Sequence, residues 1–206
     1  MQQHDPSTQP HTASQNAPAR DLAILVVCAL AMIFLHTLVS GQYGFHRDEL
    51  LTYTNARHLE WGYVVYPPMT PLLARVELEL FGTSLRGFRF LAAVAQGLVL
   101  LFTGLTAGEL GGSRQAQLFA ALAASICGHM LFSGSFMSYS SFDNLWWVLV
   151  AYFVIRPLKS DDPRWWLAIG AALALGMLTK YTMGALALGV VGGVFLTDVR
   201  RRLRSP

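Results

Sequence analysis

Apolar residues gather into six largely uncharged runs along the chain, separated by shorter polar segments. The runs cover residues 22–39, 85–107, 117–132, 142–155, 165–178 and 182–196. A helix needs about 20 apolar residues to cross the hydrocarbon core of a bilayer, and shorter runs cross when their flanks enter the interface. The pattern predicts an all-α polytopic membrane protein with about six transmembrane helices. Ser113, Ser141 and Asp162 with Pro163 are expected to start three of them.

The segment 40–84 departs from this pattern because it mixes charges, prolines and aromatic residues. Residues 48–60 have a helical pattern that ends at Trp61. A second helix is expected from Thr70 as its cap, with Leu73 and Leu80 on one face and Gly82 closing it. Two short amphipathic helices lying on the membrane surface fit this first loop. A small soluble subdomain is the alternative, although about 45 residues make a poor core.

Composition supports the membrane prediction: 13% of the residues are charged, 53% are hydrophobic, and the mean hydropathy is +0.42. A soluble domain carries about twice this charged fraction. The domain boundaries expected are a disordered cytoplasmic tail over 1–20, a transmembrane domain over 21–197 and a basic cytoplasmic tail over 198–206. No basic face suggests nucleic-acid binding. Cys28 and Cys127 each lie in an apolar run and are expected to be small buried hydrophobes.

Charge asymmetry predicts the orientation of the six helices. One side holds nine basic residues: Arg20, Arg114, Arg156, Lys159, Arg164, Arg200, Arg201, Arg202 and Arg204. The other holds six: Arg47, Arg57, Arg75, Arg86, Arg89 and Lys180. Basic residues favour the cytoplasmic side, so both termini are expected there, in a multi-pass protein of the cell membrane. The first loop, together with the start of the apolar run that follows it, then faces outward. It holds five of the six outward cations, which runs against the general preference of basic residues for the cytoplasmic side.

Two adjacent acids, Asp48 and Glu49, follow directly on the first apolar run. A carboxylate at the membrane surface can act as a general base on an incoming hydroxyl. Acids in the first turn of a surface helix are also favoured by its dipole. Composition does not separate these two interpretations.

Four arginines share the predicted outer boundary: Arg47, Arg57, Arg86 and Arg89. Guanidinium groups bind phosphate with two parallel hydrogen bonds, which makes a lipid phosphate a suitable partner. Alternatively the arginines snorkel or pair with Glu60, Glu77 and Glu79, and composition alone favours this second interpretation.

Asp143 and Lys180 lie on the same predicted face as Asp48, although each comes from a separate loop. Ionisable residues at the ends of membrane helices indicate functional sites, whereas helix capping is the simpler explanation of Asp143. The histidines have no metal-ligand spacing, so no metal site is predicted and a divalent-metal requirement stays open. Gly189 and Gly193 are expected to allow close helix packing.

Seven short segments together resemble the dolichyl-phosphate-mannose–protein mannosyltransferase superfamily, and more closely its bacterial membrane glycosyltransferase branch. They are FHRDEL at 45–50, RHLEWGY at 57–63, PPMTPL at 67–72, LRGFR at 85–89, ELGG at 109–112, SFDN at 141–144 and LTKY at 178–181. The likeness extends over about 41–196 in the order and spacing of that family. The combination is specific, although each segment alone would be weak.

The resemblance implies a membrane glycosyltransferase that moves a hexosyl or pentosyl group, with inversion, from a polyprenyl-phosphate donor to an acceptor on the outer membrane face. It implies Asp48 as catalytic base, with Glu49 beside it, and Asp143 as a supporting acid. Lys180 matches the position linked to the donor phosphate, and Arg47, Arg57, Arg86 and Arg89 are supporting donor-phosphate ligands. The acceptor is a lipid, a glycan or a protein.

Two departures from the family pattern affect these expectations. Some relatives place a lysine where this chain has Tyr66, which removes one phosphate contact. Full-length relatives are about twice as long, so the chain is expected to hold the amino-terminal half, with a partner chain as one source of the rest. The alternatives are a non-catalytic membrane transport or lipid-phosphate-binding protein, and a truncated inactive relative.

Overall fold

A computed structural model describes residues 17–160 and 162–197, and over this part the chain forms ten helices and no strand. The predicted all-α fold class is confirmed. The predicted tails lie outside the described residues, except that residues 17–20 form the first turn of α1 (Ala17–Val39). This helix therefore begins five residues before the apolar run that predicted it.

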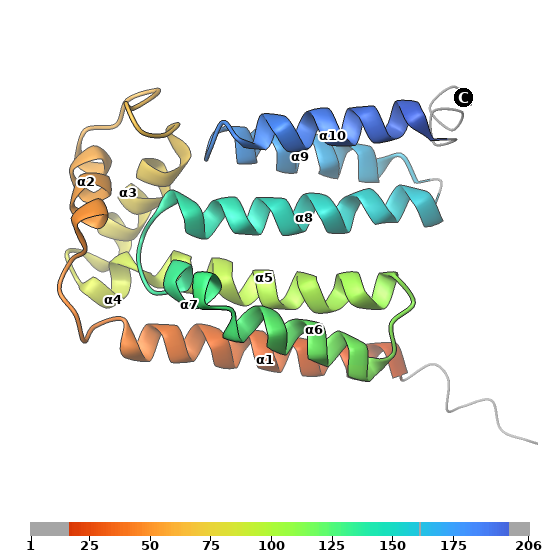
Figure 1. The fold of residues 1–206 in the computed structure, drawn as a ribbon. Helices are drawn as coiled ribbons and strands as arrows, with labels where there is room; N and C mark the ends of the chain where they lie inside the picture. The colour runs from red at the N-terminus through yellow and green to blue at the C-terminus, as the bar shows by residue number, and fades with distance from the viewer. Residues whose placement is uncertain (1–16, 161, 198–206) are drawn as a thin grey trace, which may run out of the picture.

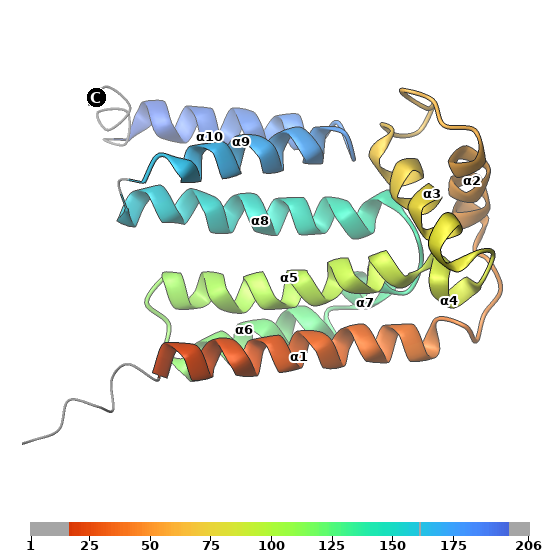
Figure 2. The ribbon, with the colours of Figure 1, turned by 180° about the vertical axis from the view of Figure 1, so that it is seen from behind.

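One group of helices, which we call the long helices, runs side by side, and a cap of further helices covers one end of this group (Figures 1 and 2). The long helices are α1, α5 (Phe90–Glu109), α6 (Arg114–Ile126), α8 (Tyr139–Lys159), α9 (Arg164–Met177) and α10 (Met183–Leu196). The cap consists of α2 (Arg47–Arg57), α3 (Met69–Phe81) and α4 (Leu85–Phe88). Helix α5 is central, because it packs against α1, α6 and α8. Helix α1 begins and α10 ends at the end away from the cap (Figure 1).

Two of the described helices are long and apolar enough to cross a membrane on their own, at Ala19–Val39 and Phe90–Glu109. A third span is obtained if α6 and α7 (Gly128–Gly134) together form one broken crossing. Helices α9 and α10 have 14 residues each, which gives about 21 Å of helix against a hydrocarbon core of about 30 Å. The structure thus supports membrane helices but only two or three of the six spans expected.

Two predicted helices are interrupted. The one expected over 85–107 divides at Arg89, where φ is −111° and ψ is 0°, into α4 and α5. The one expected over 117–132 divides at Cys127 into α6 and α7, which meet at 67°. Cys127 is exposed rather than buried, because this bend turns it outward, and Cys28 is half-buried. The break at Arg89 lies where the chain passes from the cap into the bundle, and the break at Cys127 separates α6 from the short α7.

Local capping signals were only partly predictive. Ser113 caps α6 and Gly82 ends α3 with a φ of 64°, both as expected. Thr70 does not cap α3, which begins one residue earlier, and its buried hydroxyl has no partner among the described residues. Helix α8 begins before Ser141, whose hydroxyl instead donates to the carbonyl of Ser133 at 2.5 Å. Tertiary contacts decide these two positions.

An apolar core joins the cap to the bundle. Ala56 of α2, Ala74 of α3 and Phe88 of α4 are completely buried against Ala95 of α5 and Phe142 of α8. Removing this apolar surface from water or lipid headgroups fixes how α2 lies on the bundle. The position of the first acidic pair follows from that contact.

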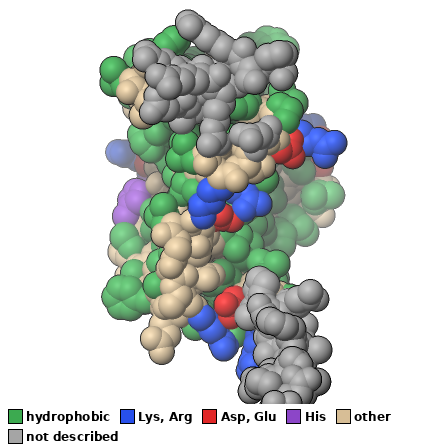
Figure 3. All heavy atoms as spheres, turned by 90° about the vertical axis from the view of Figure 1, so that its right-hand side faces the viewer, with side chains coloured by type: hydrophobic (Ala, Val, Ile, Leu, Met, Phe, Trp, Pro, Cys, Tyr) green, Lys and Arg blue, Asp and Glu red, His purple; other side chains and the backbone are tan. Residues whose placement is uncertain are grey.

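The opposite end of the bundle carries small groups of opposite charge within a mostly apolar surface (Figure 3). Arg114 lies 3.4 Å from Asp21, and Lys159 lies 3.2 Å from Glu109, which also pairs with Arg156. Such pairs at helix ends tie α1 to α6 and α5 to α8.

Candidate functional site

A cavity of about 680 Å³ opens beside the first turn of α2, and the two predicted residues Arg47 and Asp48 line it. Leu51 and Thr52 continue the same wall along the helix. His46 caps α2 by accepting the N–H of Asp48 at 3.3 Å, which places the Asp48 carboxylate at the helix start.

The opposite wall of this cavity is aromatic. Tyr66 comes from the first loop, Phe132 from α7, Phe136 from the following turn, and Tyr139 from the start of α8. Phe132 and Phe136 lie with ring centroids 4.4 Å apart, and Tyr66 lies 5.8 Å from Tyr139. Aromatic faces with a few hydroxyls and one carboxylate form a site suited to a neutral ring bearing polar substituents.

Asp48 is accessible to a ligand in this cavity. Its side chain is 57% exposed, and its nearest ionisable neighbours are Arg47, with Nε at 3.5 Å, and His46, with Nδ1 at 3.9 Å. A carboxylate that is open on one side can accept a proton from a bound hydroxyl.

Glu49 is oriented in the opposite direction and is completely buried. Its Oε2 lies 2.5 Å from Nη2 of Arg89, and its Oε1 lies 2.7 Å from Nε of the same residue. The backbone N–H groups of His46 and Met137 donate to the two oxygens at 2.8 and 2.9 Å. Both carboxylate oxygens are therefore fully engaged inside the protein.

The guanidinium group of Arg89 is also fully hydrogen-bonded inside the protein. Its side chain is 5% exposed, and besides Glu49 it donates to the carbonyls of Ser40, Tyr43 and Gly44, the last at 2.9 Å. These contacts fasten the end of α1, the start of α2, α5 and the turn before α8 to one point. We call the Glu49–Arg89 ion pair with these hydrogen bonds the buried knot.

Asp143 and Lys180 form an ion pair that contacts Tyr139, a residue of the aromatic wall. Lys180 Nζ lies 3.4 Å from Oδ2 of Asp143 and 5.1 Å from the ring centroid of Tyr139, which lines the cavity. Asp143 is the fifth residue of α8, so helix capping does not explain it. Its Oδ1 is buried without a partner among the described residues. The structure thus brings this pair next to Tyr139, which lines the same cavity as Asp48.

The first loop and the turn between α9 and α10 are joined by one backbone hydrogen bond. The N–H of Met69 donates to the carbonyl of Leu178 at 3.0 Å. This bond places the Pro67–Pro68 segment beside the turn that carries Lys180.

The remaining predicted arginines do not line the cavity. Arg57 is exposed at the far end of α2, and within the described part of the chain its side chain makes no hydrogen bond or ion pair. Arg86 is exposed and passes over Gly41, where a Cβ would lie 2.8 Å from its Nε. Glu79 pairs with Arg75 at 2.7 Å rather than with one of the four arginines for which this pairing was the alternative.

Glu77 is a second completely buried acid, on the face of α3 that meets the bundle. Its Oε1 accepts the N–H of Leu91 at 2.5 Å, and its Oε2 has no partner within the described structure. Burial raises the pKa of the Glu77 carboxyl to about 8; the Leu91 N–H opposes this shift, and the charge of Glu49 adds to it. Glu77 is therefore largely protonated at neutral pH and does not bind an arginine.

A metal site is not evident: across 17–160 and 162–197, no group of three or more His, Cys, Asp or Glu side chains could hold an ion. His36 contacts the hydroxyl of Ser135 at 3.2 Å, and His129 contacts Asn144 at the same distance. These two histidines are therefore hydrogen-bonded to neighbouring side chains.

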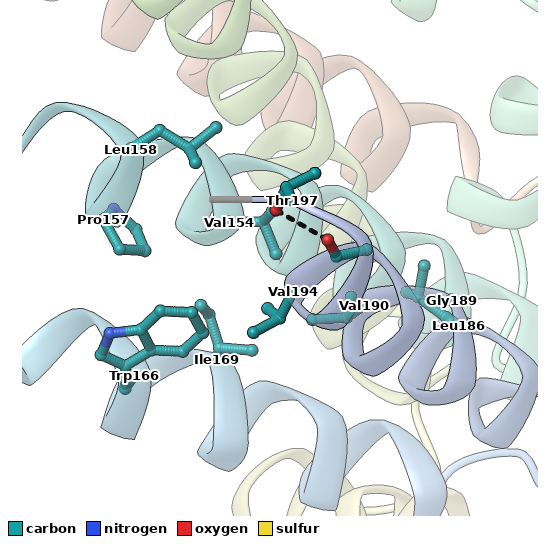
Figure 4. Close-up of a pocket in the computed structure, with 11 residues that line it drawn as sticks. Val154, Pro157, Leu158, Trp166, Ile169, Leu186, Gly189, Val190, Val194 and Thr197 are labelled. Carbon is teal, nitrogen blue, oxygen red and sulfur yellow. Dashed lines mark hydrogen bonds between the residues drawn. The ribbon is translucent and has the colours of Figure 1, made fainter. Parts of the chain in front are cut away.

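A second groove, of about 330 Å³, lies between α8, α9 and α10 (Figure 4). Its walls carry no ionisable side chain, and its one hydroxyl, of Thr197, donates to the carbonyl of Gly193 at 2.7 Å. Gly189 and Gly193 border it, and a Cβ on either would meet no atom within 4 Å. The close packing predicted for these glycines is thus not found among the described helices, and this groove lacks groups for chemistry.

Comparison with known proteins identifies the class. The family model described as dolichyl-phosphate-mannose-protein mannosyltransferase matches residues 65–206, more than two thirds of the chain. The protein belongs to this family of membrane glycosyltransferases. The matched region includes Asp143 and Lys180 and begins after Asp48. No curated protein and no solved structure matches the chain significantly.

The sequence did not point to the aromatic wall or to Trp146 as site residues. Tyr139 precedes Asp143 by four residues and so shares its helix face, a signal that was present. The indole N–H of Trp146 donates to Oγ1 of Thr179 at 2.9 Å, beside the turn that carries Lys180. Phe132 and Phe136 carried no signal, because the bend between α6 and α7 brings them to the cavity.

Proposed function

We propose that this protein transfers a sugar from a polyprenyl-phosphate donor to an acceptor hydroxyl, with inversion at the anomeric carbon. The observation that carries the proposal is the open carboxylate of Asp48 in a cavity whose aromatic wall is backed by the Lys180–Asp143 pair. A base and a cation on two sides of a ring-sized space suit displacement of a phosphate by a hydroxyl.

In this mechanism Asp48 accepts the proton of the acceptor hydroxyl as its oxygen attacks the anomeric carbon. The bond from that carbon to the phosphate oxygen breaks, and the polyprenyl phosphate leaves with the bonding electrons. Lys180 stabilises the negative charge that develops on the phosphate, and Arg47 is the second cation within reach of the cavity. Asp143 holds Lys180 in place before the donor binds.

Arg89 and Glu49 have a structural role in this proposal, because the buried knot uses all of their polar atoms. Arg57 and Arg86 contribute long-range attraction for an anionic lipid rather than direct contacts. Of the five residues predicted to bind the donor phosphate, we therefore propose direct contacts for two, Lys180 and Arg47.

We also propose that all six long helices cross the membrane, with the cap on the outer face and both termini in the cytoplasm. The parallel arrangement of the helices and the position of α1 and α10 ends away from the cap support this orientation (Figure 1). The bilayer adapts to the short α9 and α10 by local thinning, or their flanks enter its interface.

The experiment is sugar transfer from a radiolabelled polyprenyl-phosphate donor by the purified protein in lipid, beside Asp48→Asn. We expect transfer by the wild type and a fall of about 10²- to 10⁴-fold in the variant, with donor binding retained. Equal transfer by both proteins would remove Asp48 from the mechanism. Donor binding without transfer by the wild type would favour a lipid-phosphate-binding protein or a requirement for a partner chain.

A further inference from the structure

A partly buried hydrogen bond joins α8 to the turn that carries Lys180. The indole N–H of Trp146 donates to Oγ1 of Thr179 at 2.9 Å. Thr179 is completely buried, and its hydroxyl donates to the carbonyl of Leu175 at 3.0 Å. The hydroxyl is thus used as donor and acceptor at once, which fixes its rotamer.

The backbone of this turn is closely packed around the same bond. The carbonyl of Gly176 accepts the N–H groups of Thr179 and Lys180 at 2.9 and 2.8 Å. A Cβ at Gly176 would lie 2.6 Å from Cε of Met183 and 3.2 Å from Cβ of Trp146. A larger residue at Gly176 would therefore have to displace Met183 and press against Trp146.

Helix α8 therefore makes two parallel contacts with the turn, from residues three positions apart. Asp143 makes an ion pair with Lys180, whose side chain is 36% exposed, whereas Trp146 makes a partly buried contact with Thr179, which is itself completely buried. A phosphate can replace Asp143 as the partner of Lys180 while the Trp146–Thr179 bond stays in place.

We propose that Trp146, through Thr179, is a positioning residue that holds Lys180 at the cavity wall when the donor phosphate displaces Asp143. This inference rests on the proposed function. Lysine has a flexible four-carbon stem, so a fixed backbone on its N-terminal side limits the freedom that is lost when its ammonium binds phosphate. Positioning of Lys180 is therefore expected to increase the affinity for the donor and to leave the rate of the chemical step unchanged.

The variant Trp146→Phe keeps an aromatic ring and removes the N–H, and Trp147→Phe is its matched control. Trp147 is 40% exposed and makes no hydrogen bond within the described structure. We expect Trp146→Phe to raise the KM and the dissociation constant for a polyprenyl-phosphate sugar about three- to tenfold, with kcat within about twofold. Trp147→Phe should match the wild type in all three constants.

Thr179 provides the conservative test. Thr179→Ser keeps the hydroxyl and should retain wild-type donor affinity, whereas Thr179→Val removes it and should match Trp146→Phe. Combining Thr179→Val with Trp146→Phe should add no further loss, because both remove one bond.

The outcomes separate this inference from the proposed function. A wild-type protein that neither binds nor transfers the donor would overturn the proposed function itself. With wild-type transfer established, equal donor affinity in Trp146→Phe and Trp147→Phe would overturn the positioning role. A parallel loss of kcat and melting temperature in Trp146→Phe would also overturn it, since that pattern marks a general packing role.

Discussion

Asp48 and Glu49 are adjacent residues of one helical turn, yet they belong to two different regions of the molecule. The Glu49 side chain is completely buried and forms an ion pair with Arg89 at 2.5 Å. The Asp48 side chain is 57% exposed and faces a cavity. Successive helical residues point about 100° apart, so one turn supplies both a fully bonded, buried carboxylate and an exposed one.

The two ion pairs near the cap differ in the same way. In the buried knot, Glu49 and Arg89 are 0% and 5% exposed, and both carboxylate oxygens are bonded. In the second pair, Lys180 and Asp143 are 36% and 11% exposed and 3.4 Å apart, and one oxygen of Asp143 has no partner among the described groups. A saturated pair resists exchange, whereas an incompletely bonded pair can give up a partner to a ligand.

The largest expected effect on stability comes from breaking the knot. Arg89→Met leaves the Glu49 charge buried without a counter-ion, which should lower the free energy of unfolding by about 3–5 kcal/mol. Thermal unfolding in detergent measures this loss. Asp48→Asn, one position from Glu49, should leave the melting temperature unchanged. If Asp48→Asn were as destabilising as Arg89→Met, the contrast between the two regions would be refuted.

A double substitution sharpens the same test. Glu49→Gln combined with Arg89→Met removes the charge and keeps one side-chain acceptor for a backbone N–H. We expect it to regain part of the stability that Arg89→Met loses. A double variant less stable than Arg89→Met would show that the hydrogen bonds of Glu49, rather than its uncompensated charge, dominate the knot.

The next effect concerns Glu77, beside the knot. Its pKa is about 8 in the folded protein and 4.5 as the reference value, so folding is penalised increasingly as pH rises from 4.5 to 8. The penalty is absent below pH 4.5 and is on the order of 3 kcal/mol at pH 7. Glu77→Gln keeps the acceptor for Leu91, so it should be more stable than the wild type at pH 7 and equal to it near pH 4.5. Melting curves at several pH values, as wild-type minus variant differences, check this; a pH-independent difference would contradict it.

A smaller effect on stability is expected at the partly exposed Lys180–Asp143 pair. Lys180→Met removes one charged contact to the donor phosphate and should raise the KM for the donor about 10- to 100-fold, which corresponds to about 1.4–2.7 kcal/mol. Its melting temperature should change little, because the pair is partly exposed. Steady-state kinetics at varied donor concentration measure the change. A large loss of stability with an unchanged KM would place Lys180 with the knot rather than with the site.

The smallest effects are expected at the arginines outside both regions. Arg57→Ala and Arg86→Ala should change donor KM less than about threefold, and the change should vanish at high ionic strength because only long-range attraction is lost. Transfer assays at two salt concentrations test this. A salt-independent tenfold increase in KM would show direct donor contacts that the structure does not place there.

The sequence predicted the long helices best, because an apolar run of membrane length has few alternatives. It located α1 and α5 within a few residues and recognised Gly82 and Ser113 as helix boundaries. It did not predict the breaks at Arg89 and Cys127, since each is made by distant partners. Arg89 leaves the helical path where its side chain enters a cluster that includes Glu49, 40 residues earlier.

The amino-acid sequence by itself determined the fold class, the family and the identity of the polar residues that face one end of the bundle. Tertiary structure decided which of those residues are available for chemistry. Side-chain type does not distinguish Asp48 from Glu49, or Arg89 from Arg47. Burial and hydrogen-bond saturation distinguish these residues. A buried charge whose hydrogen bonds are all made has no unused donor or acceptor for a ligand, whereas a partly exposed charge keeps one.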